Sequence, residues 1–153
     1  MGILARFRSP LSRAERADLR TRITAAEKTT AGEIAIFVQR RRGKADLGQT
    51  LEQLGLRHFH ALGMEKTRSR TGILIYLHLA ERKLRLVADE GIHAKVPQAE
   101  WDALAGTLSA EIGAGRLHAG LAQAIDALGA WLATHCPPAP GDENERPDRV
   151  EIG

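Results

Sequence analysis

The residues with the clearest chemical potential are carboxylates at the ends of two predicted strands. Glu33 begins a short apolar run, and Asp89 and Glu90 follow another run beside Gly91. Because consecutive elements pack side by side, the ends of neighbouring strands can bring these acids to one edge of a sheet. Carboxylates and backbone carbonyls are the oxygen ligands that Ca²⁺ and Mg²⁺ bind. Glu33, Asp89 and Glu90 are therefore candidate ligands of a divalent metal, Ca or Mg.

A structural role is the alternative for the same acids. Glu33 and Asp89 can cap helices or form ion pairs with Arg70 or Arg85. Both roles stay open, because oxygen sites built from scattered loops leave only a weak trace in a sequence.

Other reactive side chains offer less chemistry. His58 and His60 are two positions apart on a predicted helix, so they point about 200° apart and cannot share one metal ion. His78 lies in an apolar strand, where a hydrogen-bonded structural histidine is expected. Cys136 is the only cysteine and precedes two prolines. We expect neither a zinc site nor a catalytic thiol.

The common enzyme signatures are absent from the sequence. It contains no dinucleotide-binding or phosphate-binding glycine loop, no G-x-S-x-G elbow and no H-E-x-x-H. The acidic segment 141–145 lacks the spacing of an EF-hand loop. No catalytic residue is therefore assigned.

Alternating helices and strands must position the candidate residues. Ser12 and Glu15 have the spacing of a capping box, which predicts a helix from there. Residues 33–39 are apolar and β-branched, as in a strand buried on both faces. The other predicted elements are a helix over about 47–63, strands at 73–79 and 83–88, a helix from Pro97 to about 112 and a last helix around 121–132.

The order of these elements predicts an α/β fold. Residues 80–82 are short enough to join the two later strands only as an antiparallel hairpin. We expect a three-layer α/β/α sandwich with a small mixed sheet of about four strands. The fourth strand is expected in residues 92–96 or near the tail.

Three segments divide the chain. Residues 1–11 are an N-terminal basic arm, and residues 12–136 are the α/β/α domain. Residues 137–153 form an acidic, Pro/Gly-rich C-terminal tail, either disordered or laid against the domain as an extended arm.

Composition and charge limit the classes of protein to which the chain can belong. The chain has 153 residues, 43% hydrophobic and 27% charged, as in one soluble domain. No apolar run approaches the roughly 20 residues of a membrane span, and the start lacks the apolar core of a signal peptide. We expect a cytoplasmic monomer that does not span a membrane. The basic run 40–44 is typical of a solvated face, and the scarcity of aromatics argues against single-stranded nucleic acid.

Several segments, in this order, resemble stand-alone TPM-domain proteins. They are residues 27–34 (EKTTAGEI), 70–76 (RTGILIY), 82–92 (RKLRLVADEGI), Val96-Pro97 with Trp101, 115–121 and 140–148. The resemblance covers roughly residues 12 to 150. The order and spacing of these segments together carry the resemblance.

The resemblance implies an α/β/α sandwich in which two loops cross near the sheet edge and hold divalent metal ions, often calcium. By position, these loops are residues 63–72 and 89–96. Glu33 and Asp89 match recurrent acidic positions of the family, and Glu90 matches less well. Backbone carbonyls of residues 66–71 can complete such a site.

Three functions follow as expectations. The first is a non-catalytic divalent-metal-binding interaction or regulatory module with a protein partner of unknown identity. The second is a metal-assisted phosphatase acting on phosphomonoesters, because some chloroplast relatives are described as acid phosphatases. Arg70 and Lys66 can supply positive charge, but no nucleophile stands out. The third is a basic surface, residues 40–44, that binds nucleic acid or an anionic membrane.

Overall fold

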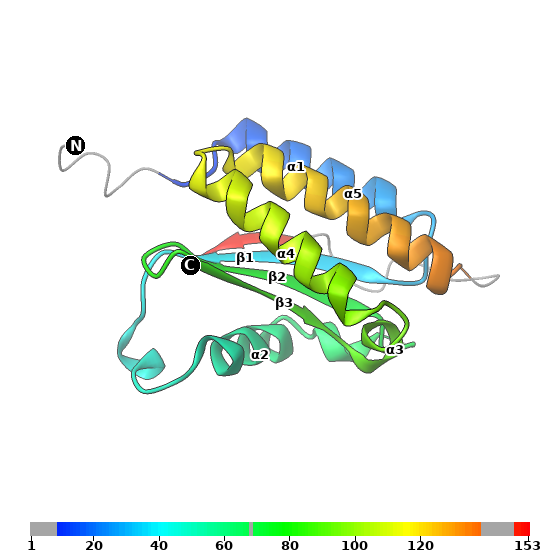
Figure 1. The fold of residues 1–153 in the computed structure, drawn as a ribbon, viewed down its shortest axis with the longest axis horizontal. Coiled ribbons are helices and arrows are strands. Elements are labelled where there is room, and N and C mark those ends of the chain that lie inside the picture. Colours follow the sequence, from blue (N-terminus) through cyan, green and yellow to red (C-terminus); the bar gives the residue numbers. More distant parts are fainter. Residues whose placement is uncertain (1–8, 68, 139–148) are drawn as a thin grey trace.

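A four-stranded mixed sheet forms the middle layer of the molecule (Figure 1). The computed structural model describes residues 9–67, 69–138 and 149–153. The strand order is β3-β2-β1-β4. β1 is parallel to β2 and β4, while β2 and β3 form an antiparallel hairpin. The strands are β1 (Glu33–Gln39), β2 (Gly72–His78), β3 (Lys83–Ala88) and β4 (Arg149–Ile152).

Helices cover both faces of this sheet (Figure 1). Three helices lie on one face and α2 (Leu51–Ala61) lies on the other. The three are α1 (Arg13–Glu27), α4 (Gln98–Gly113) and α5 (Leu117–His135). A one-turn helix, α3 (Glu90–His93), follows β3. The predicted three-layer α/β/α sandwich with an antiparallel hairpin is therefore confirmed.

The inner strands are apolar because both of their faces are covered. All seven residues of β2 are buried, and in β1 only Phe37 is partly exposed. In β3, at the edge of the sheet, only Leu84 is fully buried. The continuous apolar run that predicted a strand at residues 33–39 thus reflects burial on two sides.

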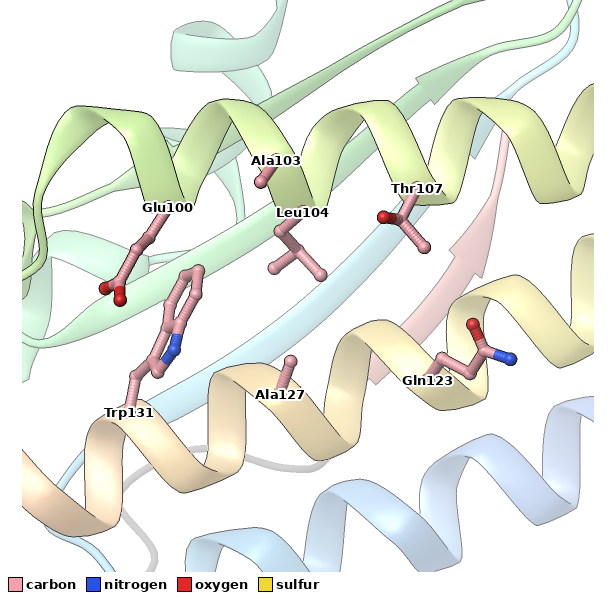
Figure 2. A pocket seen from close by; sticks show the side chains of 7 residues that line it. All are labelled: Glu100, Ala103, Leu104, Thr107, Gln123, Ala127 and Trp131. Atoms are coloured by element: carbon pink, nitrogen blue, oxygen red, sulfur yellow. The ribbon is translucent and has the colours of Figure 1, made fainter.

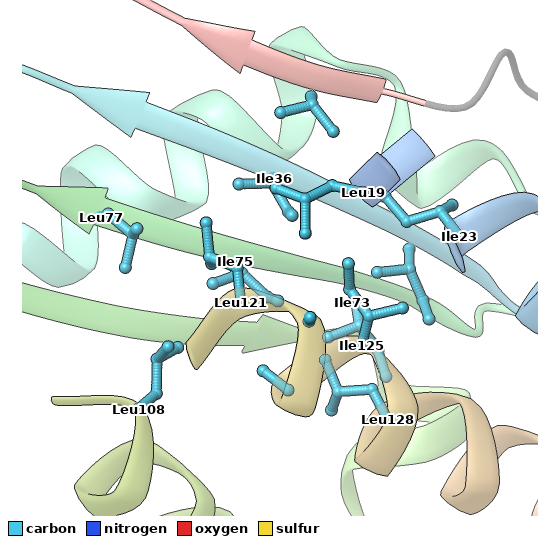
Figure 3. Packing of buried hydrophobic residues seen from close by; sticks show 14 of the residues in the cluster. Leu19, Ile23, Ile36, Ile73, Ile75, Leu77, Leu108, Leu121, Ile125 and Leu128 are labelled. Atoms are coloured by element: carbon cyan, nitrogen blue, oxygen red, sulfur yellow. The ribbon is translucent and has the colours of Figure 1, made fainter. Parts of the chain in front are cut away.

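Two hydrophobic cores hold the layers together. The larger core packs Ile36, Ile73 and Ile75 of the sheet against α1, α4 and α5 (Figure 3). The smaller core packs Leu74 and Tyr76 against α2 on the other face. Strands β1 and β2 both contribute to the two cores, so these inner strands form the centre of the structure.

The start of α1 follows the predicted capping box. The Glu15 N–H donates to Ser12 Oγ at 3.0 Å, and the Ser12 N–H donates to Glu15 Oε1 at 2.8 Å. Each side chain therefore satisfies an amide that the helix leaves free.

The predicted start of α2 at Leu47 was wrong. Leu47 is 70% exposed, and Gly48 turns the chain at φ 80°. Thr50 and Gln53 form a second capping box, so the helix begins at Leu51. The cap decides the boundary, because Leu47 has the spacing of the apolar face but lies before the cap.

The fourth strand comes from the tail and not from residues 92–96. β4 pairs with β1, and its Val150 is 2% exposed. Ile92 is buried as part of α3. The rest of the predicted arm and tail, residues 1–8 and 139–148, lies outside the described residues. Leu11, at the end of the predicted arm, is 1% exposed and belongs to the larger core.

Candidate functional site

Two loops meet at the end of the sheet where β1 and β2 begin. We call them the crossed loops: residues 62–71, between α2 and β2, and residues 89–96, after β3. The Gly91 N–H donates to the Arg70 carbonyl at 2.7 Å. A Cβ at Gly91 would lie 2.5 Å from that same carbonyl oxygen, closer than atoms can pack. Glycine at this position is therefore what lets the two backbones touch.

Glu33 and Asp89 lie at this end of the sheet, on either side of Gly72. Glu33 pairs with Gly72 at the start of β1, and the Asp89 N–H donates to the Gly72 carbonyl at 2.9 Å. Because side chains alternate along a strand, both acids are on the α2 face, as are Ala35 and Val87. Two strand spacings, about 9–10 Å, separate their backbones. The two acids share one sheet edge without being neighbours.

The Asp89 carboxylate accepts hydrogen bonds from two partners. Its Oδ2 accepts from Arg70 Nε at 2.8 Å, and its Oδ1 accepts from the Glu90 N–H at 2.8 Å. Its side chain is 7% exposed, whereas that of Glu90 is 76% exposed. Glu90 Oε1 lies 3.8 Å from Arg70 Nη1. For Asp89 the structure shows the structural alternative: it caps α3 and pairs with Arg70.

A further carboxylate, Glu65, faces the same arginine from the 3₁₀ turn Met64–Lys66. Its Oε2 is buried and accepts no hydrogen bond from the residues that the structure describes. His60 Nδ1 lies 3.4 Å from this oxygen. Sequence reasoning missed Glu65 because it is one polar residue in a polar loop, with no spacing that marks it.

The charge of Arg70 is stabilised by these acids. The hydrogen bond to Asp89 is the main cause that raises the pKa of Arg70. The negative charges of Glu90 and Glu65 raise it further. Arg70 has a left-handed backbone (φ 54°), which costs a non-glycine residue on the order of 1 kcal/mol. Its side chain is 47% exposed, so it can move into solvent without repacking the core.

No preformed metal cage exists in the described part of the chain. Residues 9–67, 69–138 and 149–153 contain no group of three or more acidic, histidine or cysteine side chains placed to hold a metal ion. The Arg70 guanidinium lies against the Asp89 and Glu90 carboxylates of the crossed loops. The donor chemistry of carboxylates and carbonyls suits a hard cation, but such an ion has to displace Arg70.

A second polar cluster lies at the opposite end of the sheet, beneath α2. The Tyr76 hydroxyl donates to Gln39 Oε1 at 2.5 Å, and Gln39 Nε2 donates to Asp46 Oδ2 at 2.8 Å. Burial by itself raises the pKa of Asp46, but hydrogen bonds from Gly43 and Arg57 lower it to about 2. These side chains satisfy one another, so the cluster anchors the segment before α2 to the sheet.

The histidines and the cysteine of the sequence analysis do not form a site. His58 stacks on Phe37 with ring centroids 4.0 Å apart, while His60 faces Glu65. Burial lowers the pKa of His58, which favours the neutral form of its ring. Burial raises the pKa of the Cys136 thiol, which makes it a poor nucleophile.

A shallow groove of about 370 Å³ separates α4 from α5 (Figure 2). Leu104 and Ala127 line its middle, with Glu100 and Trp131 at one end and Gln123 at the other. The groove gathers no cluster of ionisable groups, so we assign it no chemistry. Within the described residues, no helix is both long and apolar enough to cross a membrane.

Comparisons with known proteins give one family and several similar folds. The sequence model of the TPM domain matches residues 6–131. The NMR structure of BA42 protein from the psychrophilic bacterium Bizionia argentinensis is 25% identical, with a TM-score of 0.85, and the match covers 97% of this chain and 99% of that chain. No curated protein matches this chain.

Two more distant structures share the fold alone. The N-terminal domain of a P. gingivalis protein is 20% identical, with a TM-score of 0.69 over 86% of this chain and 83% of that chain. The N-terminal domain of cg2496 from Corynebacterium glutamicum is 12% identical, with a TM-score of 0.60 over 84% of this chain and 78% of that chain.

Proposed function

The chain belongs to the TPM-domain family, and we propose that it is a non-catalytic module whose crossed loops bind one divalent cation, calcium or magnesium. In this proposal the cation replaces the Arg70 guanidinium. The bound ion then fixes the two loops in an arrangement that a protein partner recognises.

The position of Arg70 is the observation that carries the proposal. Its guanidinium lies 2.8 Å from Asp89 Oδ2 and 3.8 Å from Glu90 Oε1. Among the residues that the structure describes, Asp89, Glu90 and Glu65 surround this guanidinium, and carboxylates attract a cation of higher charge more strongly. A divalent ion offers that charge, and the exposed arginine can leave without opening the core.

Oxygen donors for such an ion come from both crossed loops. Asp89 and Glu90 supply carboxylates from one loop, and Glu65 supplies a buried one from the other. The Ser69 and Arg70 carbonyls lie close to Gly91, where the loops touch. Calcium takes about six to eight oxygens and accepts water among them, so this set suits calcium better than a softer metal.

Glu33 has a different place in the proposal. It lies on the other side of Gly72, about two strand spacings from Asp89. It is 4% exposed at the start of β1. We therefore assign it to the wall of the site, where its charge adds to the field acting on the cation, and assign direct contact to Asp89, Glu90 and Glu65.

Calorimetric titration of chelator-treated protein with Ca²⁺, and separately with Mg²⁺, tests this function. We expect saturable binding that is lost in Asp89→Ala and strongly weakened in Asp89→Asn. The Asn variant keeps a side chain that caps α3, so it separates loss of charge from loss of the cap. Asp126→Ala is the matched control, because Asp126 is 65% exposed on α5, away from the crossed loops.

Arg70→Gln gives the sharper result. If the metal replaces the guanidinium, removing this competing cation must tighten metal binding, whereas a site elsewhere is unaffected. Absence of binding in both the native chain and Arg70→Gln would show the proposal to be wrong. Metal-dependent hydrolysis of p-nitrophenyl phosphate that Asp89→Asn abolishes would instead establish the metal-assisted phosphatase, with Lys66 and Arg70 as its cationic groups.

A further inference from the structure

A cavity of about 730 Å³ opens between the β2–β3 hairpin and the carboxyl-terminal end of α4. Figure 1 shows these two parts at one end of the molecule and the crossed loops at the other. The cavity therefore belongs neither to the candidate metal site nor to the groove between α4 and α5. Its volume falls in the range of about 300–1,000 Å³ that small-molecule sites occupy.

Most of the cavity wall is aliphatic. Leu77 and Leu84 come from the two strands of the hairpin, and Ile112 comes from the last turn of α4. Leu77 is 1% exposed and Leu84 is 9% exposed, so both present side chains that are fixed in the core. Gly113 completes the helical side, and a Cβ placed there would meet nothing within 4 Å. His78 and Ser109 also line the cavity, so its wall is mostly but not wholly apolar, and the space beside Gly113 is open.

The rim of the cavity is positively charged. Arg82 lies in the hairpin turn and is exposed. Lys83 also borders the cavity, but it pairs with His78 in the hairpin, so its side chain lies on the α2 face, opposite Leu84. The Arg82 side chain makes no ion pair or hydrogen bond with any residue that the structure describes. No carboxylate lines the cavity. A rim with an uncompensated guanidinium attracts an anion.

Two acids are sequence neighbours of residues that line the cavity, and both are paired with other arginines. Glu81 Oε2 accepts from Arg42 Nε at 2.7 Å. Glu111, two residues before the end of α4, accepts from Arg116 Nε at 2.7 Å. Neither carboxylate is free to cancel the positive charge of Arg82.

We propose that this cavity binds an amphipathic anion, with one aliphatic tail between the hairpin and α4 and one anionic head at Arg82. The apolar walls exclude a fully polar ligand such as inorganic phosphate, because burying its charge against leucines is costly. The basic rim discriminates against a neutral or cationic head. A medium-chain carboxylate has both required parts.

Calorimetric titration with decanoate, kept below its micelle concentration, tests the proposal. We expect saturable binding with one site per chain. Decyltrimethylammonium has the same tail with the opposite charge, and we expect its affinity to be at least about tenfold lower, equivalent to about 1.4 kcal/mol. Decyl phosphate distinguishes a phosphate-headed ligand from a carboxylate, since tighter binding than decanoate would assign the site to a lipid phosphate.

Filling the cavity provides a matched pair of variants. Gly113→Leu places a side chain in open space on the cavity wall, while Gly106→Leu places the same side chain in open space elsewhere on α4. Both replace a helical glycine, so both are expected to fold. We expect decanoate affinity to fall about tenfold in Gly113→Leu and to stay unchanged in Gly106→Leu. Ser109→Leu, one turn before Gly113 on the same wall, is expected to repeat the loss.

The charge at the rim is tested separately. Arg82→Gln is expected to weaken decanoate binding several-fold and to leave decyltrimethylammonium binding unweakened. Arg20→Gln, on the exposed side of α1, controls for loss of one positive charge from the whole molecule. Equal affinity for the two head groups, or equal losses in Gly113→Leu and Gly106→Leu, would overturn the proposal and show nonspecific detergent-like binding. Calcium binding at the crossed loops is independent of either outcome.

Discussion

Tyr76 is the single tyrosine of the chain, so its ionisation can be measured without interference. It is fully buried in β2, and its hydroxyl donates to Gln39. Burial raises the pKa of Tyr76 to about 12, because the phenolate would lose its hydration. We expect an ultraviolet titration of the folded protein to give an apparent pKa near 12, and the same titration in denaturant to give about 10.

The raised pKa of Tyr76 determines how the stability of the folded state changes at alkaline pH. The folded state holds the Tyr76 proton more tightly than the unfolded state does, so this contribution is complete below about pH 10. It is lost as pH rises towards about 12. Tyr76→Phe is expected to remove this dependence. A tyrosine titration near pH 10 in the folded protein would show instead that solvent reaches the hydroxyl.

Gly91 gives the second test at the level of single residues. A Cβ there would collide with the Ser69 and Arg70 carbonyls, which belong to rigid backbone. We expect Gly91→Ala to lower the free energy of unfolding by about 1–3 kcal/mol, as overpacking does. Gly106→Ala, in open space on α4, is expected to raise it by about 0.5–1 kcal/mol. Urea unfolding of both variants measures the difference.

At the crossed loops, two acids could be identified from the sequence more readily than the surroundings in which the fold places them. The positions of Asp89 and Glu90 could be read from the end of a predicted strand, and Arg70 was named as a possible partner of Asp89. Glu65 could not be found, because its burial depends on how the loop folds back over Gly72. A Cβ at Gly72 would lie 2.6 Å from the Met64 carbonyl, which shows how closely the loop approaches the strand.

Whole elements were predictable where a pattern was long or a cap was explicit. Strand β1 has seven residues, and its predicted bounds of residues 33–39 agree with the structure. The hairpin followed from the three residues between its strands. The start of α2 could not be placed from spacing alone, because Leu47 continues the apolar period across a turn. β4 has only four residues, too few to show a period.

Strand β4 has a measurable role despite its length. Val150 is 2% exposed and belongs to the larger core, and β4 forms the edge beside β1. We expect Val150→Ala to lower the free energy of unfolding by about 2 kcal/mol, from two buried methyl groups and the cavity left behind. Leu47→Ala, which removes an apolar side chain that is 70% exposed, should change it by less than about 0.5 kcal/mol. Equal effects in thermal unfolding would show that β4 does not hold the sheet.

For the molecule as a whole, the sheet separates two kinds of site. The crossed loops place carboxylates where β1 and β2 begin, and the cavity places Arg82 beyond the end of β2. A strand of seven residues spans about 23 Å, more than twice the Debye length of about 8 Å at physiological salt. A cation at one end and an anion at the other are therefore expected to bind without direct electrostatic coupling.

Global stability provides the most direct test of cation binding. A ligand that binds only the folded state stabilises it by RT ln(1 + [L]/Kd), which is about 2.7 kcal/mol at a hundredfold excess over Kd. We therefore expect Ca²⁺ to raise the melting temperature progressively with concentration, and Arg70→Gln to start lower and respond at lower Ca²⁺. Asp89→Asn should show no response, whereas Asp126→Ala should respond like the native chain. If Na⁺ at matched ionic strength raises the melting temperature equally, charge screening explains the effect, because screening does not require a binding site.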